Sequence, residues 1–235
     1  MTKKPTIFVA LDTTDLAQAA LWAKTTGPIT GGLKVGMEFV NTHGPQGIEV
    51  LQKACPDAKL FIDLKFHDIP NTVAGAVRTT CSRFTPAYLN VHAAGGETMM
   101  KAAKDACDSQ TKLLAVTILT SLSQEEINAV GYTDQTTPDI VKRMALLTQK
   151  CGLDGVVCSS KEIELIREAC EDTFETMVPG IRPIGSDSGD QKRIMTPIQA
   201  TSLGATNLVI GRPITGADDP QKAAEEIVES LTKIT

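Results

Sequence analysis

Residues 60–73, LFIDLKFHDIPNTV, contain the change of pattern on which the fold prediction depends. The first five residues are apolar except for Asp63, as in a strand that is buried on both faces of a parallel sheet. Apolar residues then recur at helical spacing from Val73 to Phe84, and Asn71 is the expected N-cap of that helix. The stretch therefore predicts a strand that is followed directly by a helix.

The same unit recurs along the whole chain. Seven further short apolar runs are predicted as strands, at residues 7–11, 32–37, 88–93, 113–119, 155–159, 176–181 and 207–211. Helical patterns separate them, most clearly at 140–151 and 223–231, and residues 123–132 indicate an additional short helix. Eight strand–helix units predict an α/β fold, a single-domain (β/α)₈ barrel over residues 1–235, and a doubly wound open sheet is the alternative.

Composition limits the classes of function. A chain of 235 residues that is 42% apolar can bury one large core. A net charge of −5 and the lack of a long basic run argue against nucleic-acid binding. No apolar stretch approaches the roughly 20 residues of a membrane span, and the first residues lack a signal-peptide core. Six dispersed cysteines indicate buried thiols in a reducing compartment, so a cytoplasmic protein is expected.

Charged and polar residues, together with one glycine, gather where the predicted strands end, and in a barrel the active site lies at the carboxyl ends of the strands. These residues are Asp12, Lys34, Asp63, Lys65, Asp68, Thr120, Arg182, Gly211 and Arg212. The polar segment 182–193 has the length of a mobile active-site loop, and its Gln191 could fold over a ligand.

Asp63 and Lys65 are two residues apart, so in a regular strand they would share one face and enter one pocket. A neighbouring carboxylate favours the charged form of a lysine, and a protonated lysine held in place is a general acid. Imine chemistry would require the opposite environment. A purely structural salt bridge is the alternative interpretation of this pair.

The last two strands indicate an anion site. Gly211 and Arg212 follow strand eight and Arg182 follows strand seven, at the position where barrels commonly bind phosphate, although a solvated arginine on a turn would have the same sequence. No glycine-rich nucleotide loop and no zinc-protease motif is present. A metal site of His67 and His92 with nearby carboxylates is disfavoured, because a lysine would compete for the acids.

Seven segments carry a family resemblance: VALD (9–12), LKVG (33–36), DLKFHDIPNT (63–72), TILTS (117–121), VPGIRP (178–183), GDQKRIMTP (189–197) and VIGRPIT (209–215). Together they resemble the orotidine 5′-monophosphate decarboxylases in their bacterial form, and they cover almost the whole chain. The resemblance implies a homodimeric carboxy-lyase that converts orotidine 5′-monophosphate to UMP in pyrimidine biosynthesis, without a metal or cofactor and without nucleic-acid or membrane partners.

The resemblance also implies a role for each matching residue. Lys65 would donate a proton to ring carbon 6, Asp63 would lie beside the substrate carboxylate, and Lys34 would hold Asp63 and a ribose hydroxyl. The other implied contacts are Asp12 to ribose, Thr120 to the pyrimidine, Gln191 to base and phosphate, Arg182, Gly211 and Arg212 to phosphate, and Asp68 with Ile69 and Thr72 to the neighbouring subunit's site.

Two alternatives remain open at this point. Sugar-phosphate decarboxylases and synthases of the same barrel family share the D-x-K-x-x-D pattern of residues 63–68 but use Mg²⁺. They place an acidic metal ligand at the position of Lys34, where a lysine would repel a cation. A non-catalytic barrel that binds a phosphate-containing ligand would need Arg182, Gly211 and Arg212 but would not need Lys65.

Overall fold

The computed structural model describes residues 4–132, 135–183 and 195–232. Eight parallel strands form a closed barrel in the order β1 to β8, and β8 pairs with β1. The strands are β1 (Thr6–Ala10), β2 (Gly31–Gly36), β3 (Lys59–Phe66), β4 (Tyr88–His92), β5 (Lys112–Val116), β6 (Gly155–Val157), β7 (Glu175–Val178) and β8 (Asn207–Ile210). The (β/α)₈ prediction is therefore confirmed, and the open sheet is excluded because β1 and β8 are joined.

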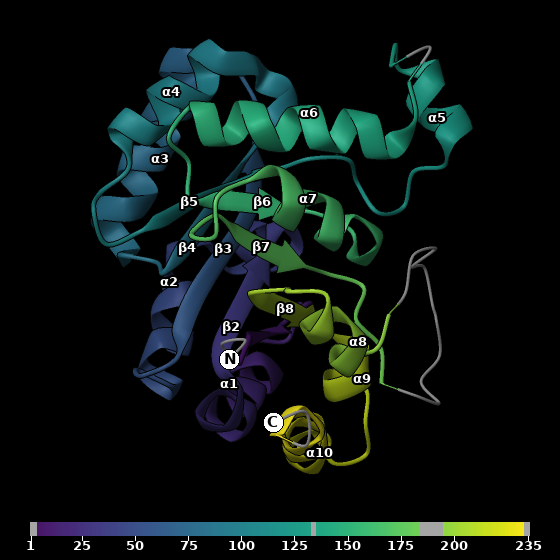
Figure 1. Ribbon diagram of the computed structural model, residues 1–235. Coiled ribbons are helices and arrows are strands. Elements are labelled where there is room, and N and C mark those ends of the chain that lie inside the picture. The colour runs from purple at the N-terminus through teal and green to yellow at the C-terminus, as the bar shows by residue number, and fades with distance from the viewer. Residues whose placement is uncertain (1–3, 133–134, 184–194, 233–235) are drawn as a thin grey trace.

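Helices surround the barrel. They are α1 (Leu16–Thr30), α2 (Met37–Ala54), α3 (Pro70–Phe84), α4 (Gly96–Ala106), α5 (Gln124–Ala129), α6 (Thr137–Lys150), α7 (Ile163–Ala169), α8 (Pro197–Ser202), α9 (Arg212–Thr215) and α10 (Pro220–Thr232). The last helix, α10, packs against the first, α1, and so closes the ring of helices (Figure 1). The short helix predicted at 123–132 is present as α5, which starts with a capping box from Ser123 and Glu126.

Several predicted boundaries are wrong. The run 113–119 predicted a strand to residue 119, but β5 ends at Val116, and β6 and β7 also stop two or three residues before their predicted ends. Near the barrel mouth the chain leaves the sheet although its residues remain apolar. Asn71 is not the N-cap of α3, because Ile69 takes that position and Pro70 starts the helix. Proline suits the first helical position, where its missing N–H costs no hydrogen bond.

The core has two layers that follow the alternation of each strand. A larger cluster lies between strands and helices and includes Ile7 and Val9 of β1. Phe8, which lies between them in sequence, belongs to a second cluster in the barrel lumen. That cluster is made of Phe8, Ala10, Phe61, Tyr88, Leu114, Met177 and Val209. Phe8, Phe61 and Tyr88 pack edge to face there, with ring centroids 5.3–6.4 Å apart. These side chains therefore fill the middle of the lumen.

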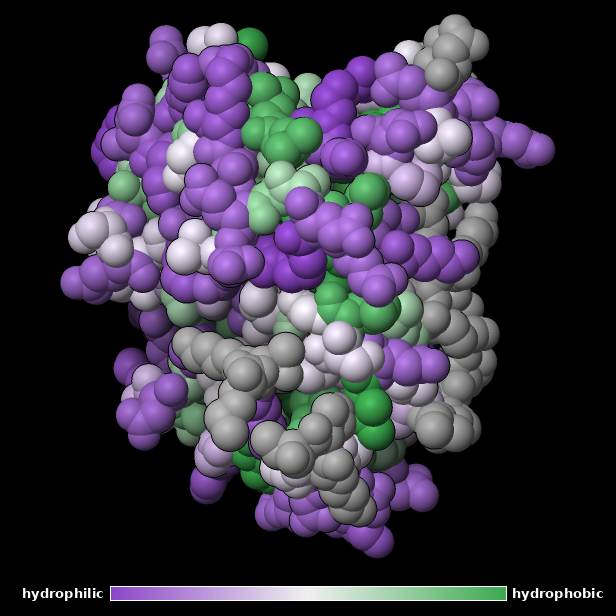
Figure 2. Space-filling model, in the orientation of Figure 1, coloured by the Kyte–Doolittle hydropathy of each residue, from purple (hydrophilic) through white to green (hydrophobic). Residues whose placement is uncertain are grey.

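The surface shown in Figure 2 is mainly hydrophilic, with small hydrophobic patches. All six cysteines are free thiols; four are buried as predicted, but Cys107 and Cys170 are only partly buried. No helix in the described part of the chain has both the length and the apolar character needed to cross a bilayer.

Candidate active site

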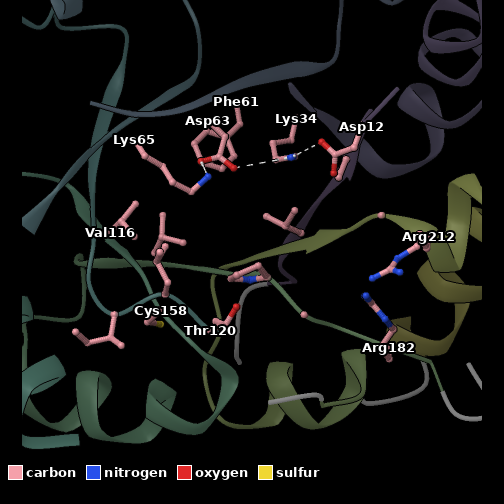
Figure 3. Close-up of a pocket in the computed structure, with 18 residues that line it drawn as sticks. Asp12, Lys34, Phe61, Asp63, Lys65, Val116, Thr120, Cys158, Arg182 and Arg212 are labelled. Carbon is pink, nitrogen blue, oxygen red and sulfur yellow. Dashed lines mark hydrogen bonds and ion pairs between the residues drawn. The ribbon is translucent and has the colours of Figure 1, made fainter. Parts of the chain in front are cut away.

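A cavity of about 520 Å³ lies over the lumen cluster. Ala10, Phe61 and Val209 of that cluster form part of its lining. Residues at or just beyond the carboxyl ends of the strands form the rest of its lining (Figure 3). The predicted site residues in this lining are Asp12, Lys34, Asp63, Lys65, Thr120, Arg182, Gly211 and Arg212. The structure thus brings together residues from the first, second, third, fifth, seventh and eighth strands.

Four of these residues form a chain of alternating charge. Lys34 Nζ lies 2.8 Å from Asp12 Oδ1 and 3.8 Å from Asp63 Oδ2, and Lys65 Nζ lies 2.7 Å from Asp63 Oδ1 (Figure 3). The register of the sheet causes this proximity, because Lys34 pairs with Ala10 of β1 while Gly36 pairs with Asp63 of β3. Parallel strands in this register place their charged ends side by side.

Lys65 reaches Asp63 by a different backbone path from the predicted one. Asp63 and Lys65 line one cavity as predicted, but the strand that carries them is not regular. The β3–β4 register shifts between Ile62 and Phe66, and Lys65 has φ of 53°, in the left-handed region. A non-glycine residue adopts this conformation only where its surroundings hold it there.

Sequence reasoning missed Asn90, which lies in β4 and is fully buried. Its Nδ2 donates to Asp63 Oδ1 at 2.7 Å, and its Oδ1 accepts a hydrogen bond from the backbone N–H of Lys65 at 2.8 Å. A polar residue inside the otherwise apolar strand YLNVH was the available signal, because a buried amide requires partners.

The ionic contacts determine the charge of Asp63. Burial alone would raise the pKa of Asp63, but Lys34 and Lys65, together with hydrogen bonds from Lys65 and Asn90, bring it below its ordinary value. Asp63 is therefore a carboxylate at neutral pH, although its side chain is only 13% exposed.

His67 and His92 lie together at the end of β3 and β4, with ring centroids 5.3 Å apart. Burial, with His67 and Lys65 nearby, lowers the pKa of His92 to about 4, so this ring is neutral at pH 7. Among the described residues no group of three or more histidine, cysteine or acidic side chains could hold a metal ion.

Two arginines form the other side of the cavity. Arg182 and Arg212 point toward each other, across the cavity from Asp63 and Lys65 (Figure 3). Arg182 is only 7% exposed, and its Nη1 donates to the carbonyl of Ile181 at 2.9 Å. Arg212 begins α9 directly after Gly211. Two converging guanidinium groups favour an anion between them, and their planar forks match a phosphate.

Three described site residues that the sequence predicted do not line the cavity in this chain. Asp68, Ile69 and Thr72 are exposed on the turn after β3 and the first turn of α3, and Asp68 Oδ1 accepts from the N–H of Ile69 at 2.6 Å. Gln191 and most of the predicted loop 182–193 lie outside the described residues. The roles of all the predicted site residues stay predictions.

Comparison with known proteins finds relatives over almost the whole length of this chain. The sequence model of the Orotidine 5'-phosphate decarboxylase / HUMPS family matches residues 5–227. A protein of Rhodospirillum rubrum named orotidine 5'-phosphate decarboxylase is 46% identical over 98% of this chain and 95% of its own length. A protein of Moorella thermoacetica with the same name is 44% identical over 100% of this chain and 95% of its own length.

A solved structure shows the same likeness. The crystal structure of orotidine 5'-phosphate decarboxylase from Lactobacillus acidophilus superposes with a TM-score of 0.83 at 34% identity, and the match covers 97% of this chain and 99% of that one. The family model and the relatives together span almost all of the chain. The chain therefore belongs to the orotidine 5'-phosphate decarboxylase / HUMPS family.

Proposed function

We propose that this protein is a cytoplasmic carboxy-lyase that converts orotidine 5′-monophosphate to UMP in pyrimidine biosynthesis, with Lys65 as the proton donor and without a metal or cofactor. One observation carries the proposal: the Lys65 ammonium is held 2.7 Å from the Asp63 carboxylate on the opposite side of one cavity from two converging arginines. This arrangement suits a substrate with a phosphate at one end and a reacting carbon at the other.

The phosphate would bind between Arg182 and Arg212 and against the backbone at Gly211. With the phosphate there, the ribose hydroxyls would lie near Asp12 and Lys34, and the pyrimidine near Thr120, which lines the same cavity. Gln191 would bridge base and phosphate. Binding energy from the phosphate, which takes no part in the reaction, would hold the ring in position for the chemical step.

The chemical step uses Lys65 and Asp63, on the side of the cavity opposite the two arginines. The bond between ring carbon 6 and the carboxylate breaks, CO₂ leaves, and the electron pair remains on carbon 6. The ammonium of Lys65 stabilises this carbanion and then transfers one proton to it, which leaves a neutral amine that solvent reprotonates. Asp63 stays ionised because its pKa is lowered, so it repels the substrate carboxylate until that group departs as neutral CO₂.

A second copy of the chain would complete the site. Asp68, Ile69 and Thr72 lie outside the cavity of their own chain, and Ile69 is 67% exposed although it is apolar. We propose that they enter the cavity of a partner in a homodimer. Mixing an Asp68→Asn variant with a Lys65→Ala variant tests this: heterodimers would contain one intact site and recover part of the activity. If the mixture stays as inactive as its components after subunit exchange, Asp68 does not act in trans.

Lys34 argues against the magnesium-dependent alternative. Its ammonium lies between Asp12 and Asp63, where it occupies the carboxylates that a divalent cation would need and repels such a cation. Adding EDTA to the assay separates the two: full activity is expected, and loss of activity that Mg²⁺ restores would favour the alternative.

The direct test follows the loss of orotidine 5′-monophosphate absorbance on adding the protein, with Lys65→Ala as the variant and Lys101→Ala, an exposed lysine of α4, as its control. The expected result is no measurable turnover by Lys65→Ala, unchanged turnover by Lys101→Ala, and UMP binding by both in calorimetry. A non-catalytic binding barrel predicts UMP binding without turnover by any of the proteins. Substantial turnover by Lys65→Ala would refute the proton-donor role.

A further inference from the structure

Asn90 is a buried amide that makes one donated and one accepted side-chain hydrogen bond, both to active-site residues of β3. Its neighbours in β4, Leu89 and Val91, are fully buried and belong to the cluster between strands and helices. Alternation along the strand therefore turns Asn90 toward the lumen, directly below the cavity mouth. An amide in this position would destabilise the barrel unless its donor and acceptor were both paired.

The pairing is specific for an amide. The backbone N–H of Lys65 can only donate, so it must meet Asn90 Oδ1, and the carboxylate of Asp63 can only accept, so it must meet Asn90 Nδ2. Leucine would have nearly the same shape but would supply neither contact. Aspartate would accept from Lys65 but would bring a second negative charge against Asp63.

The backbone of β3 explains why these contacts are needed. In the β3–β4 ladder Ile62 pairs with Leu89 and Phe66 pairs with Val91, so Asn90 lies opposite three residues of β3. That bulge contains Asp63 and Lys65, and Lys65 is left-handed within it. The ladder gives this segment no regular pairing, and the Asn90 side chain supplies the missing acceptor for Lys65.

We propose that Asn90 is a positioning residue that holds the Lys65 backbone and the Asp63 carboxylate in one fixed arrangement for proton transfer. This inference rests on the proposed decarboxylase function and assigns Asn90 no contact with substrate. Asn90 Nδ2 and Lys65 Nζ bind the same oxygen, Asp63 Oδ1. The other oxygen, Asp63 Oδ2, is the one that contacts Lys34. The Asn90 amide therefore fixes which carboxylate oxygen faces each lysine.

The expected kinetic signature is a fall in kcat with little change in KM. The arginines that bind phosphate lie across the cavity and do not depend on Asn90, whereas a misplaced ammonium slows proton transfer (Figure 3). Small displacements of a reacting group cost about 100-fold in rate. We therefore expect Asn90→Leu to lower kcat by about 100-fold, with KM and the Kd for UMP each within about threefold of wild type.

A second signature is the pH dependence of kcat. The hydrogen bond from Asn90 is among the contacts that lower the pKa of Asp63, together with Lys34 from β2 and Lys65 on the same strand, while His92 faces the group from β4. Loss of that bond raises the pKa of Asp63, so the acidic limb of the profile is expected to move to higher pH in Asn90→Leu.

The chain offers a matched control. Asn207 is also a buried strand asparagine, but it lies at the start of β8, where its Nδ2 donates to Glu175 Oε2 at 3.1 Å. Asn207→Leu makes the same change of shape and removes a comparable buried contact far from the cavity. It is expected to lose stability in urea as Asn90→Leu does, while its kcat and the acidic limb of its profile stay as in wild type.

The two asparagine variants decide the inference. If Asn90→Leu and Asn207→Leu lower kcat equally, or if Asn90→Leu loses UMP binding along with kcat, Asn90 has only a structural role. If Asn90→Leu does not fold, Asn90→Ser replaces it, because serine keeps a small polar side chain. Asn90→Ser is expected to show a smaller fall in kcat and a shift of the acidic limb in the same direction. An acidic limb that does not shift would overturn the proposal. A wild-type protein without turnover refutes the decarboxylase function and this inference together, whereas an active wild type with an unaffected Asn90→Leu refutes only the inference.

Discussion

Replacing Lys34 by methionine tests whether the ion pairs of Lys34 with Asp12 and Asp63 stabilise the fold as well as the site. Lys34 is only 7% exposed, and its ammonium contacts Asp12 and Asp63. Methionine keeps most of the length and apolar stem of lysine but removes the charge. The variant therefore leaves the buried carboxylate of Asp63 with Lys65 and Asn90 as its remaining partners.

The size of the effect follows from the two distances. At an effective dielectric constant of roughly 20, charges 3.8 Å apart attract by about 4 kcal/mol, which applies to Lys34 and Asp63 because both side chains are largely buried. The contact with Asp12 adds little, because that side chain is 55% exposed and the median exposed ion pair contributes about 0–1 kcal/mol. Removing one partner of a buried pair costs about 3–5 kcal/mol, and the remaining partners of Asp63 reduce the expected loss to about 2–4 kcal/mol.

Urea unfolding at a fixed protein concentration measures this loss, with Lys101→Met in the exposed Lys101–Glu97 pair as the control. The control should leave the free energy of unfolding almost unchanged, because an exposed ion pair contributes little to stability. Because the folded protein holds the pKa of Asp63 below its ordinary value, wild type loses this stabilisation as the pH falls below about 4.

The difference in free energy of unfolding between wild type and Lys34→Met should therefore become smaller as the pH is lowered from 7 toward 3.5. If Lys34→Met loses less than about 1 kcal/mol of unfolding free energy at pH 7, or if this loss does not change with pH, the ion pair with Asp63 does not stabilise the fold as argued.

Two further predictions concern the lumen and the histidine pair. Phe8→Ala should lower the free energy of unfolding by about 3–5 kcal/mol, because Phe8 is fully buried against the rings of Phe61 and Tyr88; a loss below about 1 kcal/mol in urea would contradict the packed lumen. The pKa of His92 is about 4 in the folded protein and near 6.5 when unfolded, so wild type should lose stability relative to His92→Gln as the pH falls from 6.5 to 4. A stability difference that stays constant over that range would show that His92 titrates normally.

The sequence predicted the barrel because the signals for its elements are local. Apolar runs of strand length and helical spacing, such as those of residues 60–64 and 73–84, depend on neighbours within one element. Their eightfold repetition then restricts the ways in which they can be layered. The boundaries were less predictable, since Leu119 and Ile118 are apolar but lie beyond the last paired residue of β5.

The order of charged residues along the chain also indicated the site, because all parallel strands of a barrel end on the same side. Asp12, Lys34, Asp63 and Lys65 could therefore be assigned to one cavity without knowing any distance between them. The resemblance of the sequence to a known family added a catalytic or binding role for each of these residues, and the proposed experiments test those roles.

The tertiary structure alone decided how these groups are held. The left-handed conformation of Lys65 and the bulge around it depend on the register between β3 and β4, which no local pattern encodes. Asn90 acts on residues 25 and 27 positions away in sequence, so its partners appear only when the two strands are side by side. The sequence by itself determined which elements form and which charges lie at their ends, since those follow from interactions between near neighbours. The sharing of Asp63 among Lys34, Lys65 and Asn90 was decided by the fold, since a buried charge is stabilised only by groups that the barrel brings to it.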